Sequence, residues 1–192
     1  RRLLTEWKEQ KEGCLRAHLA DWEAYWDQCE ITVPSRRLQE AFELERYKIF
    51  CNEREEHLPV TLMGIWNPDD RMSACTGDLH NDLNVMACYW PSYKTNHIKA
   101  VKAYISYYAR ECMPRMEKRA ELLFGVKNAV HVPVMMAPKG YGASAEWCYW
   151  NMLPGPELFV STDFCWYYVY SRDLDTLKTD IYPFLEKVAN LY

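Results

Sequence analysis

The sequence lacks the residue spacings that mark most metal sites and many catalytic sites. Its eight cysteines are scattered, with no Cys-x-x-Cys pair and no cysteine–histidine spacing typical of zinc. Signatures of phosphate loops, zinc proteases and nucleotide-binding folds are missing, and so is a Ser-His-Asp pattern. We therefore expect no metal and no cofactor. Scattered cysteines without a disulfide pattern point only slightly toward a cytoplasmic location.

Other absences exclude whole classes of protein. No apolar run is long enough to cross a membrane, and no signal-peptide pattern is visible. The formal net charge of −4 argues against broad nucleic-acid binding, and the apolar fraction of 49% argues against disorder. The 192 residues fit one domain or part of a larger one. Because the chain begins Arg1-Arg2 without a methionine, we expect it to be a piece of something longer.

What the sequence does have is many tyrosines and tryptophans, 14 and 8 of them. These side chains pack well in cores, and they also stack on the flat apolar faces of sugars and bases. Core packing accounts for most of them. A ligand platform is expected only where tryptophan stands among acids and amides.

Apolar residues at helical spacing predict an all-α fold. The expected helices are 15–26, 36–56 after the cap Ser35, 82–90, 96–124 ending at Gly125, 157–171, and a last one after the cap Asp173. Pro114 and Pro183 should bend two of them, because proline removes a backbone donor. The helix at 157–171 is apolar nearly all round, so we expect other helices to surround it.

The buried face of the second helix is expected at its apolar positions. These are Leu38, Phe42, Tyr47 and Phe50. The last helix should point inward through Leu174, Leu177, Ile181, Phe184 and Val188. The joining segments 57–81 and 126–157 carry tryptophan, glycine and polar residues, and the shorter segment 91–96 is polar, as expected of one functional rim of a helical barrel. No strand hairpin pattern is visible.

The densest polar stretch runs from Gly77 to Pro91. Within it Asp82 and Asn84 stand two residues apart, so their side chains point the same way on extended backbone and diverge in a helix. Asp82 has an alternative role as a helix cap. A cap would leave the polar residues His80, Asn81 and Asn84 beside Trp90 unexplained. A carboxylate and amides could instead hold a water or sugar hydroxyls while the indole stacks on the ring.

A second candidate is Glu146 with Trp147, after the glycine-containing segment 140–144. A glutamate among aromatics is desolvated, which raises its pKa and suits a general acid. The alternative is a helix-start glutamate favoured by the helix dipole. His131, between two valines, is interpreted as a satisfied core histidine.

Several motifs resemble glycoside hydrolase family 95, the α-L-fucosidase and α-L-galactosidase family. Residues 58–67 resemble its LPxNLQGIWN segment, residues 77–80 its GDYH, and residues 82–84 with 89–91 its NIN…YWP. Looser similarity at 18–22 and 180–185 extends the resemblance over nearly the whole chain.

The resemblance implies an (α/α)6 toroid, of which residues 1–192 would form roughly the first half, as a partial catalytic domain with long loops on one rim. It implies hydrolysis with inversion, in which a water is held by two asparagines working with an aspartate. Asn84 matches the second asparagine, while Asp82 replaces the first and could itself deprotonate water. The general acid of the family would lie beyond Tyr192. The expected sugar-lining residues are His80, Trp66, Asn67, Trp90, Glu146 and Trp147.

The expected partners are a carbohydrate substrate and either the remainder of the same chain or a self-association partner, with no nucleic acid and no membrane. With Asp82 in place of the family asparagine, three outcomes stay open: Asp82 acts as a direct base, the enzyme acts on a different sugar, or the activity is lost. The competing hypothesis is a non-catalytic carbohydrate-binding or scaffold helical domain. A sugar phosphorylase would need basic residues for phosphate, and the key loops show none.

Overall fold

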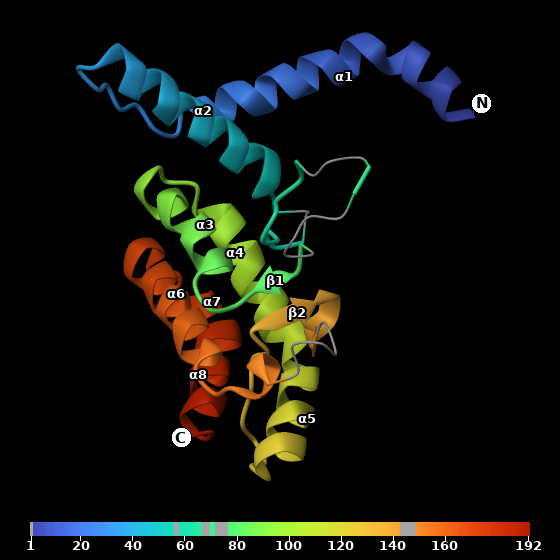
Figure 1. Ribbon diagram of the computed structural model, residues 1–192. Helices are drawn as coiled ribbons and strands as arrows, with labels where there is room; N and C mark the ends of the chain where they lie inside the picture. The colour runs from blue at the N-terminus through green and yellow to red at the C-terminus, as the bar shows by residue number, and fades with distance from the viewer. Residues whose placement is uncertain (1, 56–57, 67–69, 72–76, 143–148) are drawn as a thin grey trace.

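A computed structural model describes residues 2–55, 58–66, 70–71, 77–142 and 149–192 (Figure 1). Its α-helices are α1 (Arg2–Trp26), α2 (Arg36–Asn52), α3 (Asn84–Lys94), α4 (Ile98–Ser106), α5 (Met113–Phe124), α6 (Pro156–Ser171), α7 (Leu174–Thr176) and α8 (Tyr182–Ala189). Helical architecture agrees with the predicted all-α fold. Among the described residues no helix is long and apolar enough to span a membrane.

A small antiparallel sheet, absent from the prediction, lies beside the helices. Its strands are β1 (Leu79–His80), β2 (Met135–Ala137) and β3 (Tyr141–Gly142), in the order β1-β2-β3. Strands of two or three residues are too short to show an alternating pattern, so sequence periodicity could not reveal them. Short 3₁₀ turns at Pro138–Gly140 and Trp150–Met152 flank β3.

The core lies between α3, α4, α5, α6 and α8, as the main body of Figure 1 shows. Its largest fully buried side chains include Tyr104, Tyr108, Phe164 and Phe184. The tyrosines stack closely, with the ring centroids of Tyr89 and Tyr104 4.5 Å apart. Core packing thus explains many of the aromatics, as predicted.

Two long helices are interrupted just before a proline. π-helical turns at Tyr107–Cys112 and Leu177–Ile181 precede α5 and α8, in which Pro114 and Pro183 are the second residues. In both, the residue before the proline donates its N–H to the carbonyl five residues back, Met113 to Tyr108 and Tyr182 to Leu177. Proline lacks the N–H for the next regular bond, so the wider turn absorbs the mismatch. The predicted breaks are present, and Gly125 ends α5 with a positive φ.

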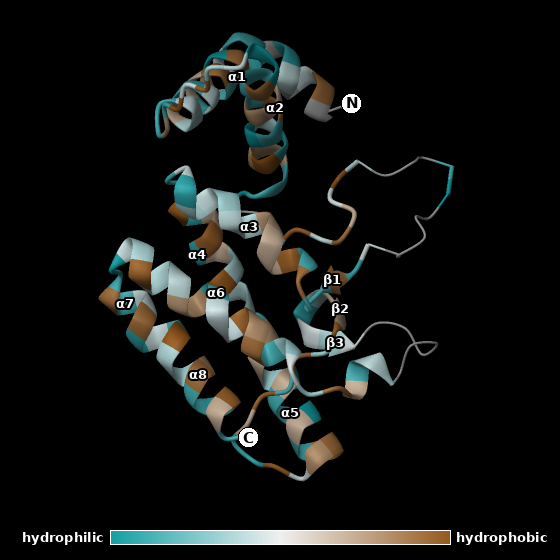
Figure 2. Ribbon diagram, turned by 60° about the vertical axis from the view of Figure 1, so that its left-hand side comes forward, coloured by the Kyte–Doolittle hydropathy of each residue, from teal (hydrophilic) through white to brown (hydrophobic). Residues whose placement is uncertain are grey.

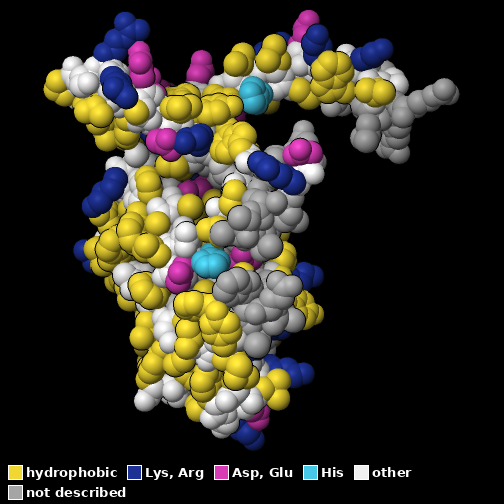
Figure 3. Space-filling model, viewed as in Figure 1, with side chains coloured by type: hydrophobic (Ala, Val, Ile, Leu, Met, Phe, Trp, Pro, Cys, Tyr) yellow, Lys and Arg dark blue, Asp and Glu magenta, His cyan; other side chains and the backbone are white. Residues whose placement is uncertain are grey.

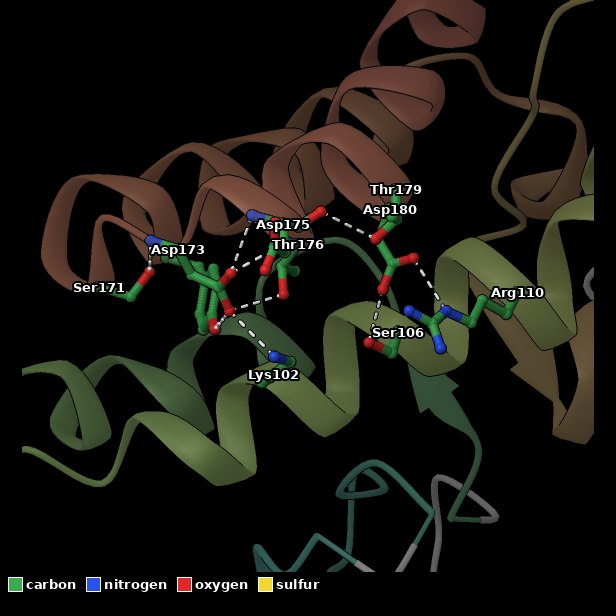
Figure 4. A network of polar contacts seen from close by, with 10 residues as sticks. Lys102, Ser106, Arg110, Ser171, Asp173, Asp175, Thr176, Thr179 and Asp180 are labelled. Carbon is green, nitrogen blue, oxygen red and sulfur yellow. Dashed lines mark hydrogen bonds and ion pairs between the residues drawn. The ribbon is translucent and has the colours of Figure 1, made fainter.

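Side-chain bonds fasten α4 to the last helices (Figure 4). The Asp173 carboxylate accepts the N–H groups of Asp175 and Thr176, confirming the predicted cap, and also binds Lys102 at 3.0 Å. Two turns on, Asp180 is buried and accepts from Ser106 at 2.7 Å and Arg110 at 2.8 Å. The last helix therefore has two fixed points along its partner.

The α1–α2 hairpin differs most from the prediction. It stands above the main body in Figures 1 and 2, and α2 ends at Asn52, four residues early. Leu38 and Tyr47 are exposed, whereas the buried residue of α2 is Arg46. The guanidinium of Arg46 lies 4.6 Å from the Trp26 ring centroid and donates to the Trp26 carbonyl. The cation–π contact and the apolar stem of its side chain let Arg46 occupy a buried position.

Two other burial predictions are wrong in part. Leu174 is exposed because it lies in the first turn of α7, while Ile181, Phe184 and Val188 are buried as expected. Helix α6 is buried on only one face, through residues such as Phe164. Its other face is an exposed apolar stripe, and hydrophobic side chains gather over this lower part of the molecule in Figure 3. The stripe consists of Leu158, Phe159, Trp166, Val169 and Tyr170.

Candidate functional site

The sheet fixes the chain just before α3. β1 pairs with β2 in the register Leu79 to Met136 and His80 to Met135. Leu79 is buried in the core, so the alternation of a strand turns His80 to the other side. This pairing sets the direction in which the polar stretch leaves the sheet.

Asn81, which the sequence left unexplained, anchors that exit. It is fully buried, its N–H bonds the Val134 carbonyl at 2.7 Å, and its side-chain nitrogen donates to the Pro133 carbonyl at 2.9 Å. The Tyr108 hydroxyl donates to its Oδ1 at 2.5 Å. With its amide satisfied by protein groups, Asn81 supports the site and does not face a ligand.

Asp78, His80 and Asp82 form a row across the turn. Asp78 Oδ2 lies 2.9 Å from His80 Nδ1, and His80 Nε2 lies 4.0 Å from Asp82 Oδ1. The side chains are 4%, 21% and 53% exposed in that order. The row therefore leads from a buried carboxylate through an imidazole to a carboxylate in contact with solvent.

Asp82 is not the N-cap of α3, which is Leu83. Its Oδ1 accepts the N–H of Leu83 at 2.6 Å, a bond outside the helix, and not those of Asn84 or Val85. Asn84 is the first residue of α3 and is exposed. Both predicted water-handling side chains are thus accessible where the turn becomes a helix.

The tryptophans lie apart from this row. Trp66 lines a cavity of about 430 Å³ between the end of α2 and α3, together with Met63, Gly64, Cys88 and Pro91. The half-exposed Trp90 donates its indole N–H to Asp163 Oδ1 on α6 at 3.2 Å. The predicted residues Asn67, Glu146 and Trp147 lie outside the described residues.

A cavity of about 260 Å³ lies on the buried side of the row. Asp78 and Leu79 line it with Thr61, Gly77 and Met136. Asp78 Oδ1 has no hydrogen-bond partner among the described residues. The carboxylate thus separates an apolar cavity from His80.

Sequence analysis missed two buried acids near α3. Glu53 accepts from the Ser92 hydroxyl at 2.6 Å, and burial, together with the nearby Asp163, raises its pKa to about 8. Burial raises the pKa of Asp163 to about 7, against the lowering effect of the Trp90 bond. Glu53 lies within the charge-rich stretch 43–56, a pattern that indicates a solvated face, so no sequence signal marked it.

His131 and Glu157 have structural roles. His131 is fully buried and its Nε2 lies 2.9 Å from the Leu153 carbonyl, in line with the predicted core histidine, although Nδ1 has no partner among the described residues. Burial lowers its pKa. Glu157 is also fully buried and accepts from the N–H groups of Val132 and Gly155. The described residues contain no group of three or more metal-ligating side chains.

Comparisons with known proteins agree with the motif resemblance. A family model described as the glycosyl hydrolase family 95 catalytic domain matches residues 33–192. A probable alpha-fucosidase A of Aspergillus niger is 26% identical over 151 residues, 79% of this chain and 19% of the relative. A probable alpha-fucosidase A of Aspergillus oryzae is 31% identical over 84 residues, 44% of this chain and 12% of the relative. No solved structure matches.

Proposed function

Because the chain belongs to glycosyl hydrolase family 95, we propose that it forms part of the catalytic domain of an inverting glycoside hydrolase. The match spans only 19% of the Aspergillus niger relative, so the activity is proposed for the full-length protein. Residues 1–192 would contribute roughly the first half of an (α/α)6 toroid. Both curated relatives are named alpha-fucosidase, which makes an α-L-fucoside the first substrate to test.

The observation that carries the proposal is the accessibility of Asp82 and Asn84 beside His80. An inverting enzyme needs a carboxylate that activates water and a carboxylic acid, about 6.5–9.5 Å away, that protonates the leaving oxygen. Asp82 would take one proton from water as the water oxygen bonds to the anomeric carbon. The glycosidic bond breaks, and its oxygen takes a proton from an acid elsewhere in the full-length protein. The Asn84 amide would orient the water or a sugar hydroxyl.

Two substitutions at one position test the base in the full-length protein. Asp82→Ala should lower kcat for an aryl α-L-fucoside by on the order of 10²- to 10⁴-fold, as loss of a general base does. Asp82→Asn recreates the two-asparagine pattern implied by the family, so it separates direct base catalysis from water positioning. Loss of activity in both variants supports a direct base, whereas unchanged turnover in Asp82→Ala would remove Asp82 from catalysis. The anomer first released, read by NMR, tests inversion.

One observation favours the alternative of a non-catalytic sugar-binding or scaffold domain. Asp82 Oδ1 already accepts the Leu83 N–H, as a purely structural carboxylate would. Under this alternative the full-length protein binds fuco-oligosaccharides without hydrolysing them, and Asp82→Ala changes stability alone. Calorimetric titration beside the kinetic assay distinguishes the two functions.

A further inference from the structure

We propose that His80 and Asp82 hold one bridging water between them and that Asp78 is the residue that positions His80 for it. This inference rests on the proposed function, in which a water is activated here. It changes the role of His80 from contacting sugar to holding water.

The first step concerns the proton on His80. The Asp78 side chain is 4% exposed, and the one hydrogen-bond partner of its carboxylate among the described residues is His80 Nδ1 at 2.9 Å. An ionised carboxylate can only accept hydrogen bonds, so Nδ1 must carry the hydrogen. In a neutral imidazole the other nitrogen, Nε2, then presents a lone pair.

The second step concerns the gap to Asp82. His80 Nε2 lies 4.0 Å from Asp82 Oδ1, so in this tautomer two acceptor atoms are neighbours. The distance is too long for a direct hydrogen bond. With the imidazole neutral, the lone pairs of these two acceptors repel each other unless a hydrogen-bond donor lies between them.

The third step identifies the donor. A group with its oxygen about 2.8 Å from each acceptor, a normal hydrogen-bond length, spans a 4.0 Å gap at an angle of roughly 90°. That is close to the angle between the two hydrogens of water. A sugar hydroxyl has one hydrogen and satisfies only one acceptor. Water therefore fits better than substrate, and both its lone pairs remain free on the side away from the two acceptors.

Asp78 acts through His80 and touches neither water nor sugar. Removing its carboxylate lets the imidazole rotate or move its proton to Nε2, and the water then loses an acceptor. Asp78→Asn keeps an oxygen that accepts from Nδ1, whereas Asp78→Leu keeps the approximate shape without an acceptor. The two variants separate hydrogen bonding from packing.

The test uses the full-length protein with ¹⁵N-labelled histidine. The His80 signals are those lost in His80→Gln, and they should report Nδ1–H with an unprotonated Nε2 at neutral pH. High-resolution crystal structures should show a water within about 3 Å of both Nε2 and Asp82 Oδ1. In Asp78→Leu the signature and the water should disappear, while kcat falls on the order of 10- to 100-fold with KM nearly unchanged.

Asp78→Asn should restore most of kcat and the Nδ1–H signature, and Asp175→Asn, on an exposed residue of α7, is the matched control. A wild-type Nε2–H signature, or an Asp78→Leu protein that keeps the water and full kcat, overturns the proposal. If Asp78→Leu does not fold, the wild-type and Asp78→Asn spectra decide alone. The spectrum and the water do not depend on turnover, so absence of hydrolysis in the wild type would contradict the proposed function and leave this inference standing.

Discussion

Trp90 on α3 donates its indole N–H to the buried carboxyl of Asp163 on α6, at 3.2 Å. The second oxygen of Asp163 has no partner among the described residues, and the Tyr93 hydroxyl bonds its backbone carbonyl instead. Asp163 therefore links α3 to α6, but its carboxylate has too few hydrogen-bond donors around it to stabilise the ionised form. Its protonation state should affect how firmly α3 and α6 stay together.

The first prediction follows from the raised pKa of Asp163, about 7. The folded protein holds this proton more tightly than the unfolded chain, in which an aspartate has a pKa of about 3.9. The contribution of Asp163 to stability is therefore complete below about pH 4, falls as pH rises through about 7, and then levels off. Glu53, raised to about 8, adds a loss of the same sign at slightly higher pH.

Asp163→Asn removes this titration and can keep an oxygen for the Trp90 indole. The unfolding temperature of the full-length variant should therefore depend less on pH between 5 and 8 than that of the wild type. Asp175→Asn, on an exposed side chain, is the control and should follow the wild-type curve. Parallel curves for Asp163→Asn and wild type would show that Asp163 is not the titrating group.

The second prediction concerns the cap at Asp173. Asp173→Ala removes a carboxylate that accepts two backbone N–H groups and binds Lys102 (Figure 4), and the lost cap alone should cost about 0.5–2 kcal/mol. Hydrogen bonds from Thr176, first among several, hold its pKa well below the usual value. Its contribution is therefore complete above about pH 4 and lost only in stronger acid. Urea unfolding at pH 7, with Asp175→Ala as control, measures the cost.

The third prediction compares two glycines in open space. Gly125 has φ of +71° and Gly13 lies inside α1, and a Cβ at either meets nothing within 4 Å. Gly125→Ala should cost on the order of 1–2 kcal/mol because only the backbone conformation opposes it. Gly13→Ala should instead stabilise by about 0.5–1 kcal/mol. Equal effects in thermal unfolding would contradict the left-handed end of α5.

The fourth prediction concerns the exposed stripe of α6. We propose that the remainder of the same chain covers it, since the match spans less than a fifth of the Aspergillus niger relative. Phe159→Lys should then destabilise the full-length protein by several kcal/mol, as burying an unpaired charge does. The control is Leu122→Lys on the exposed side of α5, expected to change stability by about 0.5 kcal/mol or less.

A residues 1–192 fragment supplies the complementary measurement. With its stripe uncovered, the fragment should bind a hydrophobic dye or self-associate. A monodisperse 192-residue monomer with low dye binding would contradict a covered stripe.

Sequence reasoning worked where one local rule determines structure and failed where tertiary contacts do. The cap at Asp173, the end at Gly125 and the breaks before Pro114 and Pro183 each follow from a single residue's chemistry. Burial of Arg46 could not be predicted, because it depends on the Trp26 ring across the hairpin. The packing of α1 against α2 likewise depends on contacts between side chains that are distant in the sequence.

The candidate site divides in the same way. The accessibility of Asp82 and Asn84 was expected from a polar stretch at the start of a helix. The support by Asn81 depends on the carbonyls of Pro133 and Val134, more than fifty residues away in the sequence. Contacts between segments that are distant in the sequence cannot be recognised from the local residue pattern.

The two π-helical turns also change how side chains line up along their helices. Each extra residue shifts the rotational phase of the helix by about 100° relative to a regular α-helix. A substitution pattern designed on one continuous 3.6-residue period across 98–124 would therefore place its apolar side chains on the wrong side beyond Cys112. In a redesign, α4 and α5 should therefore be treated as two helices with different rotational phases. Restoring one phase by deleting a residue would first require replacement of Pro114.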